Sequence, residues 1–202
     1  MGAIITNVIK TFYEQFLESL LFAVMFVICY QTIQTEAWKQ VLKKAMCDIK
    51  QSVQIRKIFL FAFVLSMVLF STIFCRVYQS NPLEIVWEHW TIFKEYHILH
   101  TEPLENTLLF IPYIFCFFWV FPNTCFREKK VTFFRCVWKS LMIGFLSSLA
   151  IEVFQLLFRV GTLQFSDMVY NTLGGVIGGI GYYSLHSIKG IYQRKKENEE
   201  GQ

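Results

Sequence analysis

Five apolar segments of membrane-spanning length alternate with polar stretches along this chain. They comprise residues 17–33, 58–75, 104–121, 140–158 and 168–186. A helix needs about 20 predominantly apolar residues to cross a hydrocarbon core, and each segment comes close to that length. The pattern predicts an all-α, polytopic membrane protein with about five transmembrane helices.

The polar stretches between these segments divide the chain into three parts. Residues 1–57 hold the first helix and a basic loop whose amphipathic pattern favours a surface helix. Residues 58–186 hold a four-helix membrane domain, and residues 187–202 form a charged tail. The loop at residues 77–103 is rich in acidic and aromatic side chains, which is typical of a segment on the membrane surface.

Composition and charge support this picture and give it an orientation. The chain is 54% hydrophobic and 17% charged, whereas average soluble domains are about 25% charged. Of its 19 lysines and arginines, 15 lie in residues 34–57, 122–139 and 187–202, and four lie on the other side of the predicted membrane. Because Lys and Arg accumulate in cytoplasmic loops, we expect the N-terminus outside and the C-terminus inside. The net charge of +4 is therefore an orientation signal rather than evidence for nucleic-acid binding.

Ionisable and amide side chains interrupt the last two apolar segments. Ionisable groups in hydrocarbon cost about 2.5–3.5 kcal/mol each on insertion scales, so each needs a partner or a function. At about 100° per residue, one stripe of the fourth helix carries Gly144, Ser148, Glu152, Gln155 and Arg159. A comparable stripe of the fifth helix carries Asp167, Asn171, Gly174, Gly175 and Gly178. We expect the two stripes to face each other.

Small residues on the same two helices indicate how they pack. The residues that we expect to mediate this packing are Gly144, Ser148, Gly174, Gly175, Gly178 and Gly179. The glycines of the fifth helix form two GxxxG pairs, which let a neighbouring helix approach closely. The fourth and fifth helices are therefore predicted to form a tight antiparallel hairpin with its turn at residues 161–166.

Other polar side chains reach the same membrane depth from the second and third helices. Arg76 ends the second helix, and Asn106 lies near the start of the third. The predicted ligand-binding residues are Arg76, Asn106, Glu152, Gln155, Arg159, Asp167 and Asn171. Three interpretations stay open: a buried ion network in which Glu152 pairs with Arg159 or Arg76, an outward-facing pocket whose arginines bind an anionic ligand, and catalysis with Glu152 as acid or base.

The sequence offers little support for the catalytic interpretation. It contains no metal-ligand set and no placed nucleophile, so we expect no metal and no cofactor. His97 and His100 lie in the acidic loop, where a solvated or interfacial position is typical. A non-enzymatic role is therefore favoured, with Glu152 as the alternative catalytic residue.

The same residues carry a resemblance to a known family. The motifs are IEVFQLLFR at residues 151–159, SDMVYNTLGGVIGG at residues 166–179, ENTLLFIP at residues 105–112 and STIFCR at residues 71–76. With these motifs the chain resembles the VanZ-like family of bacterial membrane proteins, named for a protein associated with resistance to teicoplanin. The family pattern falls on Arg76, Asn106, Pro112, Glu152, Gln155, Arg159, Asp167, Asn171, Gly174 and Gly178. Tyr113 departs from the pattern, because the family often has a small or aliphatic residue there.

The resemblance implies a multi-pass protein of the bacterial cytoplasmic membrane with a role in glycopeptide resistance. The first hypothesis is a binding protein whose outward-facing site holds a cell-wall lipid intermediate or a lipoglycopeptide. The alternative is an intramembrane enzyme that modifies a lipid-linked cell-envelope precursor with Glu152 as acid/base. A third hypothesis is a scaffold whose glycine-lined helices contact another protein. The expected partners are thus the lipid bilayer and one such amphiphile, without nucleic acid, and the sequence assigns no oligomeric state.

Overall fold

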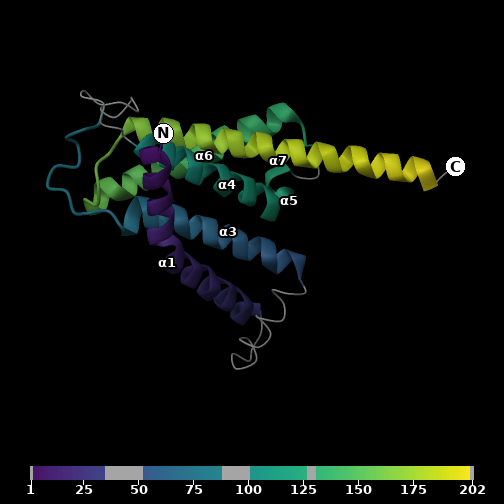
Figure 1. The fold of residues 1–202 in the computed structure, drawn as a ribbon, viewed down its shortest axis with the longest axis horizontal. Helices are drawn as coiled ribbons and strands as arrows, with labels where there is room; N and C mark the ends of the chain where they lie inside the picture. Colours follow the sequence, from purple (N-terminus) through teal and green to yellow (C-terminus); the bar gives the residue numbers. More distant parts are fainter. Residues whose placement is uncertain (1, 35–51, 88–100, 127–130, 201–202) are drawn as a thin grey trace.

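The structure, a computed structural model, describes residues 2–34, 52–87, 101–126 and 131–200. Its helices in chain order are α1 (Gly2–Gln34), α3 (Val53–Leu69), the π-helical η1 (Phe70–Phe74), α4 (Glu102–Val120), α5 (Pro122–Phe126), α6 (Phe133–Phe158) and α7 (Phe165–Glu200). They form a bundle with α1 and α3 on one side, α6 and α7 on the other, and α4 between them (Figure 1). In the described part of the chain the helices are accompanied by one isolated β-bridge, between Tyr78 and Val160.

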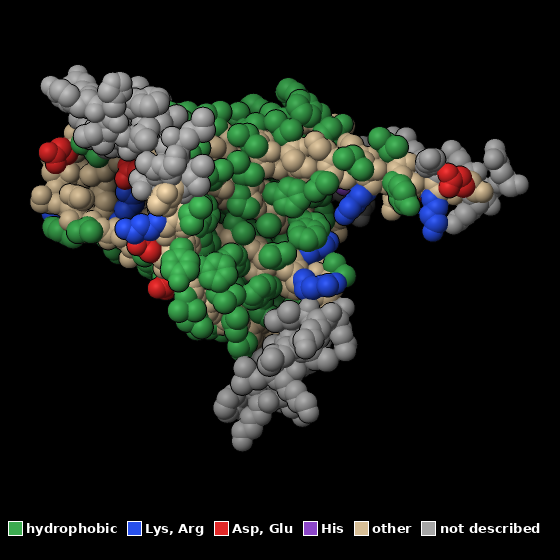
Figure 2. Space-filling model, in the orientation of Figure 1, with side chains coloured by type: hydrophobic (Ala, Val, Ile, Leu, Met, Phe, Trp, Pro, Cys, Tyr) green, Lys and Arg blue, Asp and Glu red, His purple; other side chains and the backbone are tan. Residues whose placement is uncertain are grey.

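Four described segments are long and apolar enough to cross a membrane. They are Phe12–Gln31, Val53–Phe74, Glu102–Val120 and Phe133–Phe158. Hydrophobic side chains cover the middle of the bundle, and charged side chains gather at its two ends (Figure 2). The prediction of an all-α, polytopic membrane protein is confirmed. The glycines and polar residues of α7 make it less apolar than the other four, so its crossing of the membrane stays a prediction, as does the orientation of the bundle.

The helices extend beyond their apolar segments, and α1, α6 and α7 do so most. α1 begins at Gly2, and the pair formed by Lys10 and Glu14 (Nζ to Oε1, 3.7 Å) has the i,i+4 spacing that supports a helix in this polar start. α6 begins at Phe133, seven residues earlier than predicted. α7 continues through the charged tail to Glu200, because Lys, Glu and Gln are strong helix formers and no proline interrupts them.

The two long loops are described only in part. The predicted surface helix between the first two spans lies outside the described residues, as do His97 and His100. Of the loop between η1 and α4, residues 75–87 and 101 are described, and residues 77–87 run beside the turn between α6 and α7. The backbone N–H of Leu163 in that turn donates to the carbonyl of Pro82 at 2.9 Å. The first part of this loop is therefore attached to the α6–α7 hairpin.

α4 is the central helix of the bundle. Its side chains Phe110, Ile114 and Phe118 are fully buried, and it packs against both α3 and α7. Phe118 lies edge-on against Tyr182 of α7, with 5.5 Å between ring centroids, and Phe126 of α5 stacks on the same tyrosine at 6.1 Å. These aromatic contacts join α4, α5 and α7 into one core.

Glycines on one face of α7 bring it against α4. A methyl group at Gly174 would overlap the backbone carbonyl of Thr107, and one at Gly178 would overlap that of Ile111. Because a backbone carbonyl cannot rotate away, only glycine fits at these two contacts. The small residues thus allow the close approach that stabilises helix pairs in lipid.

Glycines on the adjacent face of α7 bring it against α6. A Cβ atom at Gly175 would lie 3.5 Å from the Cα atom of Gly144, and one at Gly179 would overlap the side chain of Ser140. The prediction that all four glycines of α7 face α6 is therefore wrong for the pair that meets α4. The reason is geometric, because consecutive residues of a helix differ by about 100° in direction, so two neighbouring GxxxG pairs line two faces.

Candidate functional site

The predicted ligand-binding residues gather at one end of the bundle, which we call the arginine end. It comprises η1, the start of α4, the turn between α6 and α7, and the start of α7. Arg76 and Arg159 belong to its surface. The opposite end, where α3 begins and α4 ends, carries Lys57 and Trp119, and we call it the lysine end.

The turn at the arginine end is attached by its backbone to the chain that follows η1. Arg159 caps α6 in the left-handed conformation (φ 54°, ψ 38°), and its carbonyl accepts from the N–H of Gln79 at 2.8 Å. The N–H of Gly161 donates to the carbonyl of Val77 at 3.0 Å. Gly161 has a φ of 83°, a conformation that favours glycine. These bonds hold the segment just after Arg76 against the turn.

Glu152 lies beneath this turn, with 2% of its surface exposed. Its Oε2 accepts a hydrogen bond from the backbone N–H of Gln164 at 2.9 Å. Gln164 directly precedes α7, so the carboxylate joins the end of α6 to the start of α7. Asp167, in the first turn of α7, and Arg76 lie close enough to act on the charge of Glu152. An acidic residue such as Asp167 is favourable there because of the helix dipole.

Two buried amide side chains join neighbouring helices at the same depth. Gln155 Nε2 donates to the carbonyl of Thr72 at 2.6 Å, which connects α6 to η1. Carbonyls at the end of a helix lack partners within it, so this bond satisfies one of them. Asn171 Nδ2 donates to Ser148 Oγ at 2.9 Å, which connects α7 to α6. The site is thus assembled by contacts between helices rather than within them.

Several polar atoms around these contacts are buried and make no hydrogen bond with the described residues. They are Asn106 Nδ2, Gln155 Oε1, Ser166 Oγ and Asn171 Oδ1. Leaving a buried donor or acceptor unsatisfied costs about 1–3 kcal/mol, and such groups in native proteins call for an explanation. Four of them at one end of the bundle are what a site for a polar ligand group would require.

The two arginines differ in their surroundings. Arg76 Nη1 lies 3.8 Å from Glu102 Oε1, and both side chains are partly exposed. Arg159 is exposed, and its Nη1 donates to the hydroxyl of Tyr78 at 3.4 Å. Among the described residues, neither arginine forms an ion pair with Glu152, a pairing that the sequence left open. The guanidinium groups therefore lie at the surface of the arginine end, above the buried carboxylate.

The stripe predicted on α6 is divided in the structure. Gly144, Ser148, Glu152 and Gln155 are buried, whereas Arg159 is exposed. The predicted stripe requires a helix that continues through Arg159. Since α6 ends at Phe158 and Arg159 has left-handed backbone angles, its side chain leaves the stripe.

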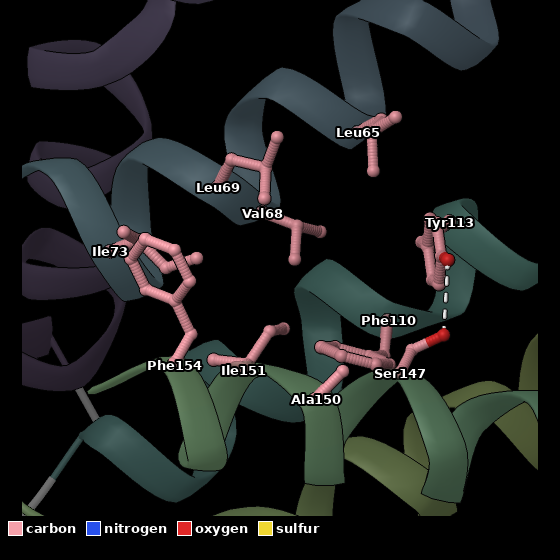
Figure 3. A pocket seen from close by; sticks show the side chains of 10 residues that line it. All are labelled: Leu65, Val68, Leu69, Ile73, Phe110, Tyr113, Ser147, Ala150, Ile151 and Phe154. Atoms are coloured by element: carbon pink, nitrogen blue, oxygen red, sulfur yellow. Dashed lines mark hydrogen bonds between the residues drawn. The ribbon is translucent and has the colours of Figure 1, made fainter. Parts of the chain in front are cut away.

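An apolar groove extends from this polar region along the bundle. It has a volume of about 330 Å³ and is lined by Leu65, Val68, Leu69, Ile73, Phe110, Tyr113, Ser147, Ala150, Ile151 and Phe154. Figure 3 shows it between α3–η1 and α6, with α4 behind, and with Ile73 and Phe154 at one end and Tyr113 and Ser147 at the other. The two hydroxyls at that far end lie 3.1 Å apart, within hydrogen-bond distance.

The groove and the polar site adjoin each other along η1 and α6. Ile73 follows Thr72, and Phe154 precedes Gln155, the two residues whose hydrogen bond joins η1 to α6. Arg76 follows Ile73 closely in the chain, just after the end of η1. An elongated molecule lying in the groove would therefore present its polar end to the guanidinium groups.

Four contributors to the site were not predicted from the sequence. Gln164 acts through its backbone N–H, which no side-chain pattern can show. Glu102 and Tyr78, the partners of the arginines, lie in or beside a loop whose path is set by tertiary contacts. Tyr113 could have been found, because it departs from the family pattern, and it supplies one of the two hydroxyls at the far end of the groove.

A known protein family matches nearly the whole chain. Residues 4–186 match the family model described as VanZ/LLP1. The match includes α1, which lies outside the motifs that carry the resemblance, and ends before the charged part of α7. No curated protein matches the chain, and no solved structure does.

Proposed function

Because the chain belongs to the VanZ/LLP1 family, we propose that it is a membrane protein that binds an amphiphile with an anionic headgroup at its arginine end. The ligand is a lipid intermediate of cell-wall synthesis or a lipoglycopeptide. Binding in the outer half of the bacterial cytoplasmic membrane contributes to glycopeptide resistance of the teicoplanin type. The arginine end faces outward in this proposal, as the distribution of Lys and Arg predicts.

The observation that carries this proposal is the apolar groove, which is lined at one end by Ile73 of η1 and Phe154 of α6, two elements that lead to the arginine end. Its volume of about 330 Å³ lies within the range of about 300–1,000 Å³ found for small-molecule sites. An acyl or polyprenyl chain suits a groove lined by Leu, Ile and Phe, since each buried CH₂ group contributes about 0.8 kcal/mol. The groove therefore supports a ligand with a long apolar part.

The polar end of the groove suits an anionic headgroup. Arginine binds carboxylate and phosphate through paired N–H groups, and Arg76 and Arg159 both present guanidinium groups there. The unpartnered amide atoms offer further hydrogen bonds to polar groups of the ligand, with Asn106 Nδ2 as a donor and Gln155 Oε1 and Asn171 Oδ1 as acceptors. Lipid-linked wall intermediates carry pyrophosphate, and lipoglycopeptides carry carboxylate, so both have the required chemistry.

Filling the groove is expected to weaken binding selectively for acylated ligands. In Ala150→Trp an indole would occupy the groove, whereas in the control Leu149→Trp the indole would lie on a neighbouring, exposed position that does not line it. We expect Ala150→Trp to weaken binding of a fluorescent lipoglycopeptide about tenfold or more, which corresponds to about 1.4 kcal/mol or roughly two buried CH₂ groups. The measurement is a titration of the purified protein in nanodiscs.

Two comparisons make this experiment decisive. The titration is repeated with the deacylated glycopeptide and with a polyprenyl pyrophosphate, which separates the two proposed ligands. Equal binding of acylated and deacylated ligands by the wild-type protein, and no binding of the polyprenyl pyrophosphate, would contradict the role of the groove. An equal loss in Leu149→Trp would show that the effect of Ala150→Trp is not specific.

Catalysis by Glu152 is the competing function, and its geometry argues against it. The carboxylate is 2% exposed, and its Oε2 is held by the N–H of Gln164. Glu152→Gln keeps an oxygen acceptor for that N–H, so we expect resistance and ligand affinity to stay within about threefold of wild type. A general acid or base contributes about 10²–10⁴-fold to a rate, so a loss of that size would support the enzyme instead.

Glu152→Leu provides the structural comparison for the same position. It removes the acceptor and leaves the N–H of Gln164 buried without its partner, which costs about 1–3 kcal/mol. The free energy of unfolding should therefore fall in Glu152→Leu and not in Glu152→Gln. The scaffold hypothesis has less support, because α4 and α6 of the same chain fill both glycine faces of α7.

A further inference from the structure

The lysine end of the bundle has a pocket of its own, distant from the proposed amphiphile site. It has a volume of about 340 Å³ and lies where α3 begins, α4 ends and α7 leaves the bundle. Its cationic and hydrogen-bonding groups are Lys57, His186 and Lys189, and its walls include Trp119 and Tyr182. Basic side chains are seen on this side of the molecule, below the point where α7 emerges (Figure 2).

The charge of this pocket has no counterpart in the described chain. The described ion pairs join Lys10 to Glu14 and Arg76 to Glu102, so neither Lys57 nor Lys189 is neutralised by a described carboxylate. The described residues that line the pocket include no acidic side chain. Two lysines converging on one hollow repel each other, and an anion between them would remove that repulsion.

The walls of the pocket match the interfacial region of a bilayer. Lys57 Nζ lies 5.4 Å from the ring centroid of Trp119, a cation–π contact that holds the ammonium group at the rim. Trp and Tyr are enriched at headgroup depth, and lysine side chains extend from a helix end toward that depth. The pocket thus combines an apolar aromatic wall with cationic groups at the level of lipid phosphates.

We propose that this pocket binds the phosphate headgroup of an anionic phospholipid, with Lys57 and Lys189 as its charged contacts and Trp119 beside the glycerol and first acyl carbons. His186 donates a further hydrogen bond to the phosphate. The same chemistry would hold a free phosphate ion, but the apolar wall formed by Trp119 and Tyr182 favours the lipid. This site is independent of the amphiphile site at the arginine end.

The test compares two double variants that remove the same charge from the same end of the bundle. Lys57→Gln with Lys189→Gln changes the pocket, whereas Arg56→Gln with Lys139→Gln changes exposed residues that do not line it. Each protein is reconstituted in vesicles of equal parts phosphatidylglycerol and phosphatidylcholine, extracted, and its retained lipid measured by mass spectrometry. We expect the pocket variant to retain about tenfold less phosphatidylglycerol per protein and the control to match wild type.

The other outcomes would contradict either the site itself or the assignment of its ligand as a lipid. Equal losses in both double variants would show a diffuse electrostatic attraction, and no loss in the pocket variant would remove the site. Displacement of phosphatidylglycerol by inorganic phosphate alone, in the wild-type protein, would assign the pocket to a soluble anion. Because Lys57→Arg with Lys189→Arg keeps the charge, it should retain the lipid, and a failure to do so in a folded protein would also overturn the proposal.

Discussion

Gly178→Ala is expected to destabilise the protein by about 1–3 kcal/mol, although alanine is the better helix former. The added methyl group would overlap the carbonyl of Ile111 in α4, and backbone shifts that relieve such overpacking cost about that much. Alanine gains up to about 1 kcal/mol over glycine in helix propensity, so packing must dominate for stability to fall. A thermal unfolding series of the purified protein in detergent should show a drop of several degrees.

Gly190→Ala on the same helix is the matched control for this prediction. Apart from Gly190, its chain neighbours and the adjacent backbone of α7, no atom of the described residues lies within 4 Å of the position that a Cβ atom would take at Gly190. The variant therefore gains the propensity of alanine without a steric cost, and its unfolding temperature should stay unchanged or rise. Two variants with the same chemistry and opposite effects would show that α7 is held by its contact with α4. A similar unfolding temperature for both would contradict that contact.

The apolar runs of the sequence predict the helices well because burial in hydrocarbon imposes them. Four of the five predicted segments correspond to helices of membrane-spanning length and composition. Helix ends are less predictable, since Phe133 and Glu200 belong to helices that continue past the apolar runs. The partner of each helix face is harder still. Gly174 and Gly175 are adjacent in sequence, yet the nearest neighbours of Gly174 belong to α4, whereas those of Gly175 belong to both α4 and α6.

The residues of the candidate site were predictable as types and positions, but their partners were not. Glu152 and Asn171 could be placed on facing helices because helical periodicity fixes their direction. Their hydrogen bonds run to a backbone N–H and to Ser148, which depend on the turn and on the register of the hairpin. The position of Arg159 was not predictable in this way. Its left-handed backbone angles end the helix, so its side chain does not follow the helical periodicity that predicted the stripe on α6.

Packing and site geometry are coupled through the start of α4. Gly174 lies against the backbone of Thr107, and the hydroxyl of Thr107, which donates to the carbonyl of Pro103 at 2.8 Å, also lies 3.3 Å from the carbonyl oxygen of Tyr170. Asn106 and Asn171 are the sequence neighbours of these two residues, and both carry a buried polar atom without a described partner. The close approach of α4 and α7 therefore also determines where these two amides lie. Substitutions at Gly174 and Gly178, the glycines that meet α4, should therefore alter ligand binding as well as stability.

Arg76→Ala is expected to weaken binding of an anionic amphiphile by about 10–100-fold and to abolish the resistance phenotype. A hydrogen bond to a charged group contributes about 1.5–3 kcal/mol, and each 1.4 kcal/mol corresponds to a factor of ten in affinity. Because Arg76 is partly exposed and its pair with Glu102 spans 3.8 Å, loss of that pair should cost no more than about 1 kcal/mol of stability. Binding is measured by titration in nanodiscs. The amount of folded protein is measured by size-exclusion chromatography in detergent with fluorescence detection.

A charge reversal separates the ligand contact from the ion pair. Arg76→Glu combined with Glu102→Arg restores an opposite-charge pair between the segment after η1 and the start of α4 but moves the positive charge away from position 76. If Arg76 serves only the pair, the double variant should recover binding and resistance that Arg76→Ala lacks. If Arg76 contacts the anionic headgroup, as proposed, the double variant should fold normally and still fail to bind. Recovery of wild-type affinity in the double variant would therefore assign Arg76 to structure and remove it from the site.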